Sequence, residues 1–184
     1  MSLYVALQMD PVEDVSIDGD SSFRIGLEAQ IRGHQLFQYT VDQLRYDEGR
    51  VVARGRDITL RREAGNHVDF GAWQERDLTE FDVIWLRQDP PFDMAYVTST
   101  HLLERVHPQV LVVNDPFWVR NCPEKLMVLD YPDLTPPTMI ARDEASFRRF
   151  RERHGDMIVK PLYGNGGAGV FHLGPDDPNL ASLL

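Results

Sequence analysis

The sequence has 184 residues, which is enough for one domain and part of a second. Apolar residues make up 42% of it and aromatic residues 10%, so the chain can bury a core and is not expected to be disordered. Its net charge of −10 argues against nucleic-acid binding and against a polybasic membrane-binding patch. A small anionic ligand remains compatible with this charge, because a few local cations can outweigh it.

The N-terminal residues suggest neither export nor membrane insertion. The first apolar run is short and no basic segment precedes it, so we expect neither a signal peptide nor a membrane span. Cys122 is the single cysteine, which rules out an internal disulfide and fits a reducing compartment. These features predict a soluble protein of the cytoplasm.

The first forty residues predict one β-α-β unit. Residues 3–9 are an apolar run typical of a buried strand, and residues 36–39 are a second one. Between them, Asp20 is a suitable N-cap and Gly33 a suitable C-terminal stop for a helix. The apolar positions of that helix are spaced by four residues, at Phe23, Leu27 and Ile31. Two strands joined through a helix are expected to be parallel.

Residues 50–73 have a different pattern. Short strands are predicted at residues 51–53, 58–60 and 67–70. Glycines such as Gly55 are interpreted as breaks between these strands. We interpret this stretch as a small antiparallel excursion.

The β-α alternation then resumes. Residues 82–87 and 110–113 predict buried strands, and a helix is expected from about residue 93 to residue 107. Pro116 is well placed as the first residue of a short helix. Strands that alternate with helices in this way predict a doubly wound α/β domain with a mostly parallel sheet.

The pattern changes near residue 122, so we predict one domain at 1–122 and the start of a second, α+β domain at 123–184. Lys125 is expected in the first turn of a short helix, and residues 138–141 in a strand. Asp143 is predicted to cap a helix that ends at Gly155. Strands are expected at residues 157–160 and 170–173, on either side of a glycine-rich loop.

That loop is the most informative segment of the chain. Gly164, Gly166 and Gly169 have the spacing G-x-G-x-x-G, which suggests the dinucleotide-binding turn of an oxidoreductase. The dinucleotide motif must open a helix, however, whereas residues 170–173 predict a strand. A Walker A loop is also excluded, because no Gly-Lys-Ser/Thr follows.

A glycine loop between two strands has another use. Without Cβ atoms, its backbone N–H groups can approach the phosphates of a nucleotide closely. Lys160, at the end of the incoming strand, could then offer a cation to a phosphate. The competing interpretation is a flexible hairpin turn without a ligand. The lysine and the dense glycines favour phosphate binding.

Several blocks along the chain, in order, resemble the bacterial glutathione synthetase family of ATP-grasp ligases. The blocks are residues 9–11, 20–23, 27–30, 32–34, 87–93, 124–126 and 160–170. The resemblance covers almost the whole chain and implies a pre-ATP-grasp domain followed by the first part of an ATP-grasp domain. It also implies that ATP and Mg²⁺ activate γ-glutamylcysteine as an acyl phosphate, which the amine of glycine attacks to give glutathione.

The resemblance further implies the site residues. The residues expected to bind ATP are Lys125, Lys160, Tyr163, Gly164, Asn165, Gly166, Gly167, Ala168 and Gly169. Considered without the resemblance, Lys125 is interpreted as a solvated surface lysine. The family continues beyond residue 184, so the Mg²⁺ ligands are expected there, and no catalytic or metal-binding residue is assigned within this chain.

Two residues are expected to bind substrate at the ends of strands. Arg87 would face the substrate cleft, and the alternative is a structural ion pair with Asp89 or Asp93. Asp10 is a candidate for binding a substrate ammonium, although a local capping role is favoured for it.

Four functions are compatible with these features. They are glutathione formation, another ATP-grasp carboxylate–amine ligation, a non-catalytic ligand-binding fragment, and an NAD-dependent oxidoreductase, which a strand at residues 170–173 would exclude. We expect the isolated chain to be inactive and the family resemblance favours a homo-oligomer.

Overall fold

In the computed structural model, which describes residues 1–164 and 166–183, strand β1 lies inside a seven-stranded sheet with the order β3-β4-β2-β1-β6-β7. The seventh strand, β5, pairs with β4. The strands are β1 (Tyr4–Gln8), β2 (Gln35–Tyr39), β3 (Leu44–Asp47), β4 (Arg50–Leu60), β5 (Val68–Asp77), β6 (Val83–Leu86) and β7 (Leu111–Val113). Strands β2, β1, β6 and β7 are mutually parallel, and β3, β4 and β5 form an antiparallel extension.

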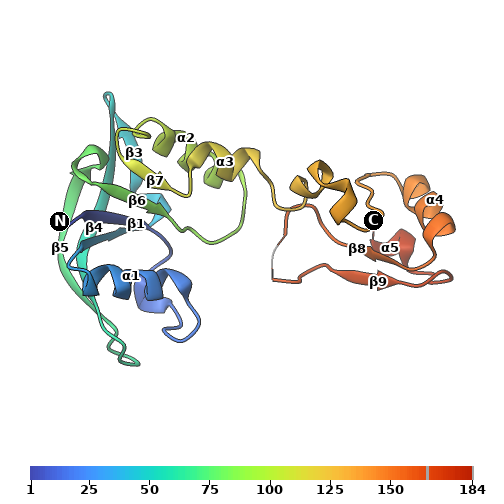
Figure 1. Ribbon diagram of the computed structural model, residues 1–184, viewed down its shortest axis with the longest axis horizontal. Coiled ribbons are helices and arrows are strands. Elements are labelled where there is room, and N and C mark those ends of the chain that lie inside the picture. The colour runs from blue at the N-terminus through green and yellow to red at the C-terminus, as the bar shows by residue number, and fades with distance from the viewer. Residues whose placement is uncertain (165, 184) are drawn as a thin grey trace. The chain divides into compact units, whose positions relative to one another are not determined.

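Helices cover both faces of this sheet (Figure 1). Helix α1 (Ser21–Ile31) lies on one face, and α2 (Met94–Glu104) with α3 (Pro116–Asn121) on the other. Short 3-10 turns occupy Val12–Asp14, Val41–Gln43 and Leu78–Glu80. The expected doubly wound α/β fold is therefore confirmed.

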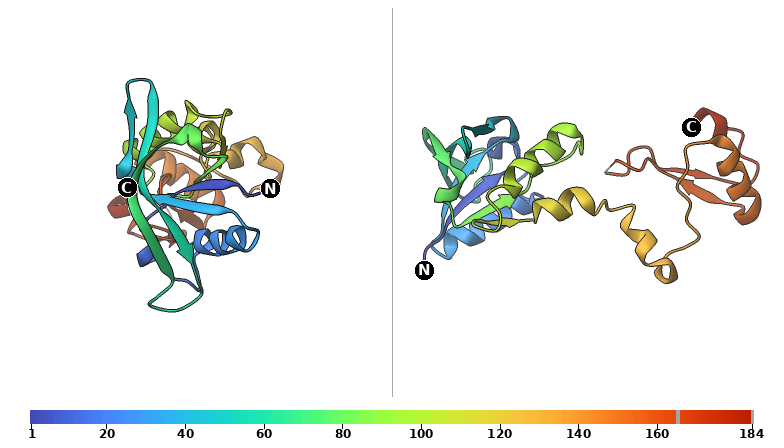
Figure 2. Two further views of the ribbon diagram at one scale, coloured as in Figure 1. Left: turned by 90° about the vertical axis from the view of Figure 1, so that its left-hand side faces the viewer. Right: turned by 90° about the horizontal axis from the view of Figure 1, so that it is seen from above.

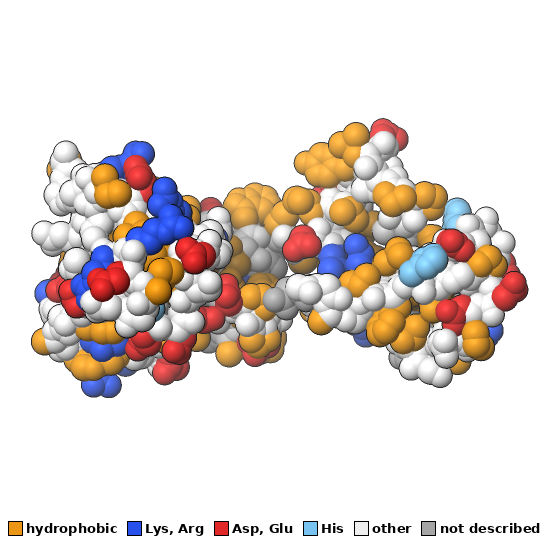
Figure 3. Space-filling view, turned by 90° about the horizontal axis from the view of Figure 1, so that it is seen from below, with side chains coloured by type: hydrophobic (Ala, Val, Ile, Leu, Met, Phe, Trp, Pro, Cys, Tyr) orange, Lys and Arg blue, Asp and Glu red, His pale blue; other side chains and the backbone are white. Residues whose placement is uncertain are grey.

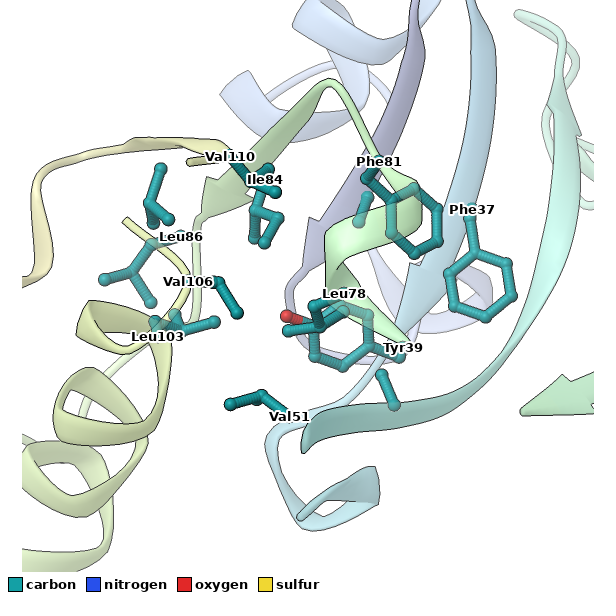
Figure 4. Packing of buried hydrophobic residues seen from close by; sticks show 13 residues of the cluster. Phe37, Tyr39, Val51, Leu78, Phe81, Ile84, Leu86, Leu103, Val106 and Val110 are labelled. Atoms are coloured by element: carbon teal, nitrogen blue, oxygen red, sulfur yellow. The ribbon is translucent and has the colours of Figure 1, made fainter. Parts of the chain in front are cut away.

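Two apolar cores follow from the alternation of side chains along the strands. Ala6 of β1 points into the core beneath α2, where Phe37, Tyr39 and Leu103 are buried (Figure 4). Its neighbours on β1 point the other way, into the core that α1 closes with Phe23. Strands buried on both faces explain why β1 reads as a continuous apolar run.

The ends of α1 confirm the capping prediction. Asp20 accepts a hydrogen bond from the backbone N–H of Phe23 at 2.6 Å. At the other end Gly33 adopts φ +82°, and the N–H of His34 donates to the carbonyl of Ala29. This is the Schellman arrangement, in which a left-handed residue closes the helix. The predicted apolar stripe was wrong at Ile31, which is 79% exposed.

The antiparallel excursion is confirmed as antiparallel, but its strands are long and belong to the main sheet (Figure 2). Gly55 was wrongly interpreted as a break, because it lies inside the single strand β4. A Cβ at this position would lie 2.3 Å from the carbonyl oxygen of Gln38 and 2.6 Å from the ring of Phe37. Glycine is therefore required so that β4 can pack against β2.

From Cys122 onward the chain forms a second compact unit, distinct from Met1–Asn121. It contains the 3-10 turns η4 (Met127–Asp130) and η5 (Pro132–Leu134), the helices α4 (Glu144–His154) and α5 (Leu180–Leu183), and the antiparallel pair β8 (Met157–Val159) and β9 (Phe171–Leu173). Phe147 and Phe150 of α4 pack against a small core that contains Met157 and Leu173.

Two local predictions in the second unit were wrong. Residues 138–141 form no strand, and Lys125 lies in a turn that precedes η4 instead of in a helix. The predicted helix from Asp143 to Gly155 is confirmed, since Asp143 caps α4 through the N–H of Ser146 and Gly155 has φ +74°.

Large apolar side chains lie exposed on the second unit (Figure 3). They include Met127, Leu129, Tyr131, Leu134, Ile140 and Ile158. None of the helices within residues 1–164 and 166–183 combines the length and the apolar character that crossing a membrane requires.

Replacing Gly55 by Ala tests the close packing of β4 on β2. We expect the free energy of unfolding to fall by about 3 kcal/mol, because the added methyl group would overlap backbone and a buried ring. Urea unfolding followed by tryptophan fluorescence measures this change in the first unit, which contains Trp73, Trp85 and Trp118.

The matched control is Gly71→Ala on β5, where the nearest atom to an added Cβ is a carbonyl oxygen at 3.4 Å. This variant should change the free energy of unfolding by less than about 0.5 kcal/mol. Equal stability of the two variants would contradict the packing role of Gly55.

Candidate functional site

The carboxyl ends of β1 and β6 meet at the point where the winding of the sheet reverses. From β1 the chain passes through α1 to β2 on one side, and from β6 it passes through α2 to β7 on the other. Open α/β sheets bind their ligands in the crevice at such a switch point. Asp10 follows β1 and Arg87 follows β6, so the fold brings both predicted substrate-binding residues to this edge.

Arg87 is tied to the first turn of α1. Its Nε donates to the hydroxyl of Ser22 at 2.9 Å, and its Nη2 donates to the hydroxyl of Ser21 at 2.6 Å. Its backbone N–H donates to the carbonyl of Gln8 and so extends the β1–β6 ladder. Within residues 1–164 and 166–183, Arg87 makes no ion pair, so the alternative of a pair with Asp89 or Asp93 is wrong.

Asp10 is exposed and lies among other carboxylates. Its pKa is raised first by partial desolvation and then by the negative charges of Asp89 and Asp20. In the described part of the chain its side chain accepts no backbone hydrogen bond, and the cap of α1 is Asp20. The structure therefore gives no support to the capping role of Asp10. Its ionised form would gain from a nearby cation such as an ammonium group.

A buried polar cluster behind this edge was not anticipated from the sequence. Gln8 is fully buried, and its Nε2 donates to Oε1 of Gln88 at 3.2 Å. Ser99 donates to the same oxygen, and the hydroxyl of Tyr96 donates to the backbone carbonyl of Gln88. The only sequence signal was a glutamine in an apolar strand. These bonds hold the segment after β6 against α2 and so fix the position of the Arg87 backbone.

In the second unit, the glycine-rich loop joins two antiparallel strands. Val159 of β8 pairs with Phe171 of β9, so the predicted hairpin is confirmed and the dinucleotide-binding turn, which needs a helix, is wrong. Gly166, Gly167 and Gly169 all adopt positive φ, between +61° and +78°. Asn165, which we also expected to contact ATP, lies outside the described residues.

The loop folds back on Pro161. A Cβ added at Gly164 would lie 3.1 Å from the Cγ atom of Pro161, and one added at Gly169 would lie 3.1 Å from its Cδ atom. At Gly166 and Gly167 an added Cβ would meet nothing within 4 Å. One side of the loop is thus packed on the proline ring and the other is open.

Lys125 lies against the same loop. Its Nζ donates to the carbonyl oxygens of Pro161 and Gly164, each at 2.7 Å. Lys160 is exposed at the end of β8, and Tyr163 is also exposed. Lys125 and Lys160 are the only two lysines in the sequence, and both lie beside this loop. The fold therefore gathers the two predicted cations and the described loop residues, including Ala168, into one place.

The described residues offer no obvious metal site. Within residues 1–164 and 166–183, no three His, Cys, Asp or Glu side chains are grouped so that they could hold an ion.

Replacing Asp10 by Ala tests whether its carboxylate is strained by its neighbours. The pKa of Asp10 is higher in the folded than in the unfolded chain, so folding favours its protonated form. This contribution to stability is complete below the unfolded pKa and is lost as the pH rises through the folded pKa. At neutral pH we therefore expect Asp10→Ala to raise the free energy of unfolding, by about 0.5 kcal/mol after allowing for solvent screening. Near pH 3.5 the gain should vanish.

Urea unfolding of the two proteins at both pH values measures this difference. A loss of about 1 kcal/mol at neutral pH would instead be the mark of a capping residue and would restore the capping interpretation.

Comparison with protein families gives consistent matches along the chain. The model of the prokaryotic glutathione synthetase N-terminal domain matches residues 3–120, and that of the prokaryotic glutathione synthetase ATP-grasp domain matches residues 124–184. Curated relatives named glutathione synthetase are similar over the whole chain, with 57% identity in Mesorhizobium japonicum and 58% in Brucella melitensis. A glutathione synthetase of Vibrio parahaemolyticus is 38% identical over 98% of the chain.

The chain spans only part of these relatives. It covers 59% of the length of the Mesorhizobium and Brucella proteins and 57% of that of the Vibrio protein.

Proposed function

Because the chain belongs to the prokaryotic glutathione synthetase family, we propose that it is part of an ATP-dependent ligase that joins γ-glutamylcysteine to glycine. The observation that carries this proposal is the β8–β9 hairpin, whose glycine loop has an open side and two adjacent lysines. Residues 1–122 are assigned to the pre-ATP-grasp domain and residues 123–184 to the beginning of the ATP-grasp domain.

The nucleotide is assigned to the second unit. The backbone N–H groups from Tyr163 to Gly169 would hold the phosphates, since glycines without Cβ atoms let a phosphate approach the backbone. Lys160 at the entrance of the loop and Lys125 beside it would add positive charge. When bound, ATP supplies the phosphoryl group that activates the substrate carboxylate as an acyl phosphate. The fixed positive charges would stabilise the negative charge that develops during transfer.

The acid substrate is assigned to the switch point of the first unit. γ-Glutamylcysteine carries one ammonium group and two carboxylates, which are complementary to a carboxylate and a guanidinium. Asp10 would bind the ammonium, which relieves the repulsion from Asp20 and Asp89. A guanidinium has five N–H donors, and the two serines accept hydrogen bonds from two of them. Arg87 would bind a carboxylate with the remaining N–H groups.

The remaining assignments rest on the family. We propose Mg²⁺ as the ion that accompanies ATP, with ligands in the part of the relatives that this chain does not cover, and glycine as the second substrate. We propose that the region of the relatives that this chain does not cover packs on the exposed apolar side chains of the second unit. A cytoplasmic homo-oligomer is the assembly that we propose.

Replacing Lys160 by Met tests the nucleotide site directly. The variant should bind ATP about tenfold to a hundredfold more weakly, because a charge-assisted hydrogen bond contributes about 1.5–3 kcal/mol. Isothermal titration of the chain with ATP measures the dissociation constant.

The control is Arg153→Met, which removes one exposed positive charge from α4 in the same unit. It should leave ATP affinity within about twofold of the unchanged protein. If both variants lose the same affinity, Lys160 acts only through net charge and its assigned role is wrong.

Product analysis tests the substrates. A protein that joins this chain to the rest of the relatives' length should form glutathione from γ-glutamylcysteine, glycine and ATP, whereas the chain alone should form none. Formation of a different amide product would point to another ATP-grasp ligase, and glutathione formation by the chain alone would contradict the partial site proposed here.

A further inference from the structure

Lys125 is the only described residue from a distant part of the chain whose side chain is hydrogen-bonded to the glycine loop. It binds the carbonyls of Pro161 and Gly164, which lie 36 and 39 residues further along the sequence. Its own position is set by a turn in which the carbonyl of Pro123 accepts hydrogen bonds from the N–H groups of Leu126 and Met127. An ammonium group held in this way ties two separate segments of the second unit together.

The direction of these bonds matters for the loop amides. In a planar trans peptide, the N–H points opposite to the C=O of the same unit. Because the carbonyl of Pro161 points at Lys125, the N–H of Leu162 must point away from it. Lys125 has only donors, so it can bind the backbone of the loop only through carbonyl oxygens.

The two lysines therefore make different contacts. The ammonium of Lys125 is engaged by two backbone carbonyls in the nucleotide-free chain. Lys160 is exposed, and its side chain makes no hydrogen bond to any residue within 1–164 and 166–183. A role as nucleotide ligand explains the position of Lys160 but leaves the two carbonyl contacts of Lys125 unexplained.

We propose that Lys125 is a positioning residue that holds the peptides of residues 161–164 with their carbonyls inward, so that the loop is ordered before the nucleotide binds. The proposal rests on the assignment of the loop as the phosphate site. This task of Lys125 is additional to the contact with ATP that is expected of both lysines. Of the three ammonium protons of Lys125, one is left over for other acceptors.

The position of Pro161 makes this role effective. The ring of Pro161 is packed between Gly164 and Gly169, so a rotation of its peptide would disturb both ends of the loop. The hydrogen bonds from Lys125 fix the peptide groups of Pro161 and Gly164 relative to each other. Loss of one side chain should therefore loosen the whole segment.

Replacing Lys125 by Met in the 184-residue chain tests the proposal without nucleotide. Backbone ¹⁵N relaxation should give order parameters at Leu162, Tyr163 and Gly164 that fall from about 0.85 to below about 0.6. Lys125→Arg should largely restore them, because a guanidinium can donate to two carbonyls. Amides of β8 and β9 serve as the internal control for folding and should remain rigid.

The matched control is Lys160→Met, which should weaken ATP binding while the loop stays ordered. If Lys125→Met leaves the order parameters of the loop unchanged, or if Lys160→Met lowers them equally, the positioning role is wrong.

A second measurement uses the unaltered chain. With only two lysines, acylation by an N-hydroxysuccinimide ester can be followed residue by residue in a mass spectrometer. Lys125 should react at least about fivefold more slowly than Lys160, because its amino group must first leave two hydrogen bonds to backbone carbonyls. The two rates should become equal in urea. Equal rates in the folded chain would overturn the proposal.

These results are independent of the assigned function. If the unaltered chain binds no ATP, the nucleotide site is wrong, yet the relaxation and acylation measurements still decide whether Lys125 orders the loop.

Discussion

The loop between β8 and β9 is closed around Pro161, and the proposed nucleotide site depends on that closure. The proline ring occupies the space that side chains at Gly164 and Gly169 would need, and Lys125 binds the carbonyls on the same side. The N–H of Leu162 consequently points away from Lys125, and the backbone around it is already bent. A preorganised loop of this kind loses less conformational entropy when a ligand binds than a free one would.

The first unit places its polar groups by topology. Reversal of the winding between β1 and β6 leaves one edge of the sheet open, and the residues that follow these strands, Asp10 and Arg87, are carried to it. The serines at the start of α1 and the buried amide of Gln8 then fix the neighbourhood of Arg87. A carboxylate in repulsion with its neighbours, and a guanidinium that is bound by two hydroxyls within the described residues, are groups that a zwitterionic ligand would satisfy.

Much of this fold could be predicted from local sequence, because caps and apolar runs act over a few residues, as at Asp20. Contacts between distant segments could not. Gly55 looks like a break until β2 is placed against β4, and Lys125 looks like a surface lysine until Pro161 is brought beside it. The tie between Arg87 and the serines of α1 was hidden for the same reason. Sequence patterns thus indicated candidate residues for the site, whereas the hydrogen-bond partners of these residues could be identified only from the fold.

The most direct test of the central claim is to map ATP onto the backbone amides of the chain. A titration of ¹⁵N-labelled protein with a non-hydrolysable ATP analogue should shift the resonances of Gly164, Gly166, Gly167 and Gly169 most strongly, in proportion to the occupancy of one site. Saturable shifts confined to the first unit, with the loop resonances unmoved, would contradict the assignment of these amides as the phosphate-binding groups.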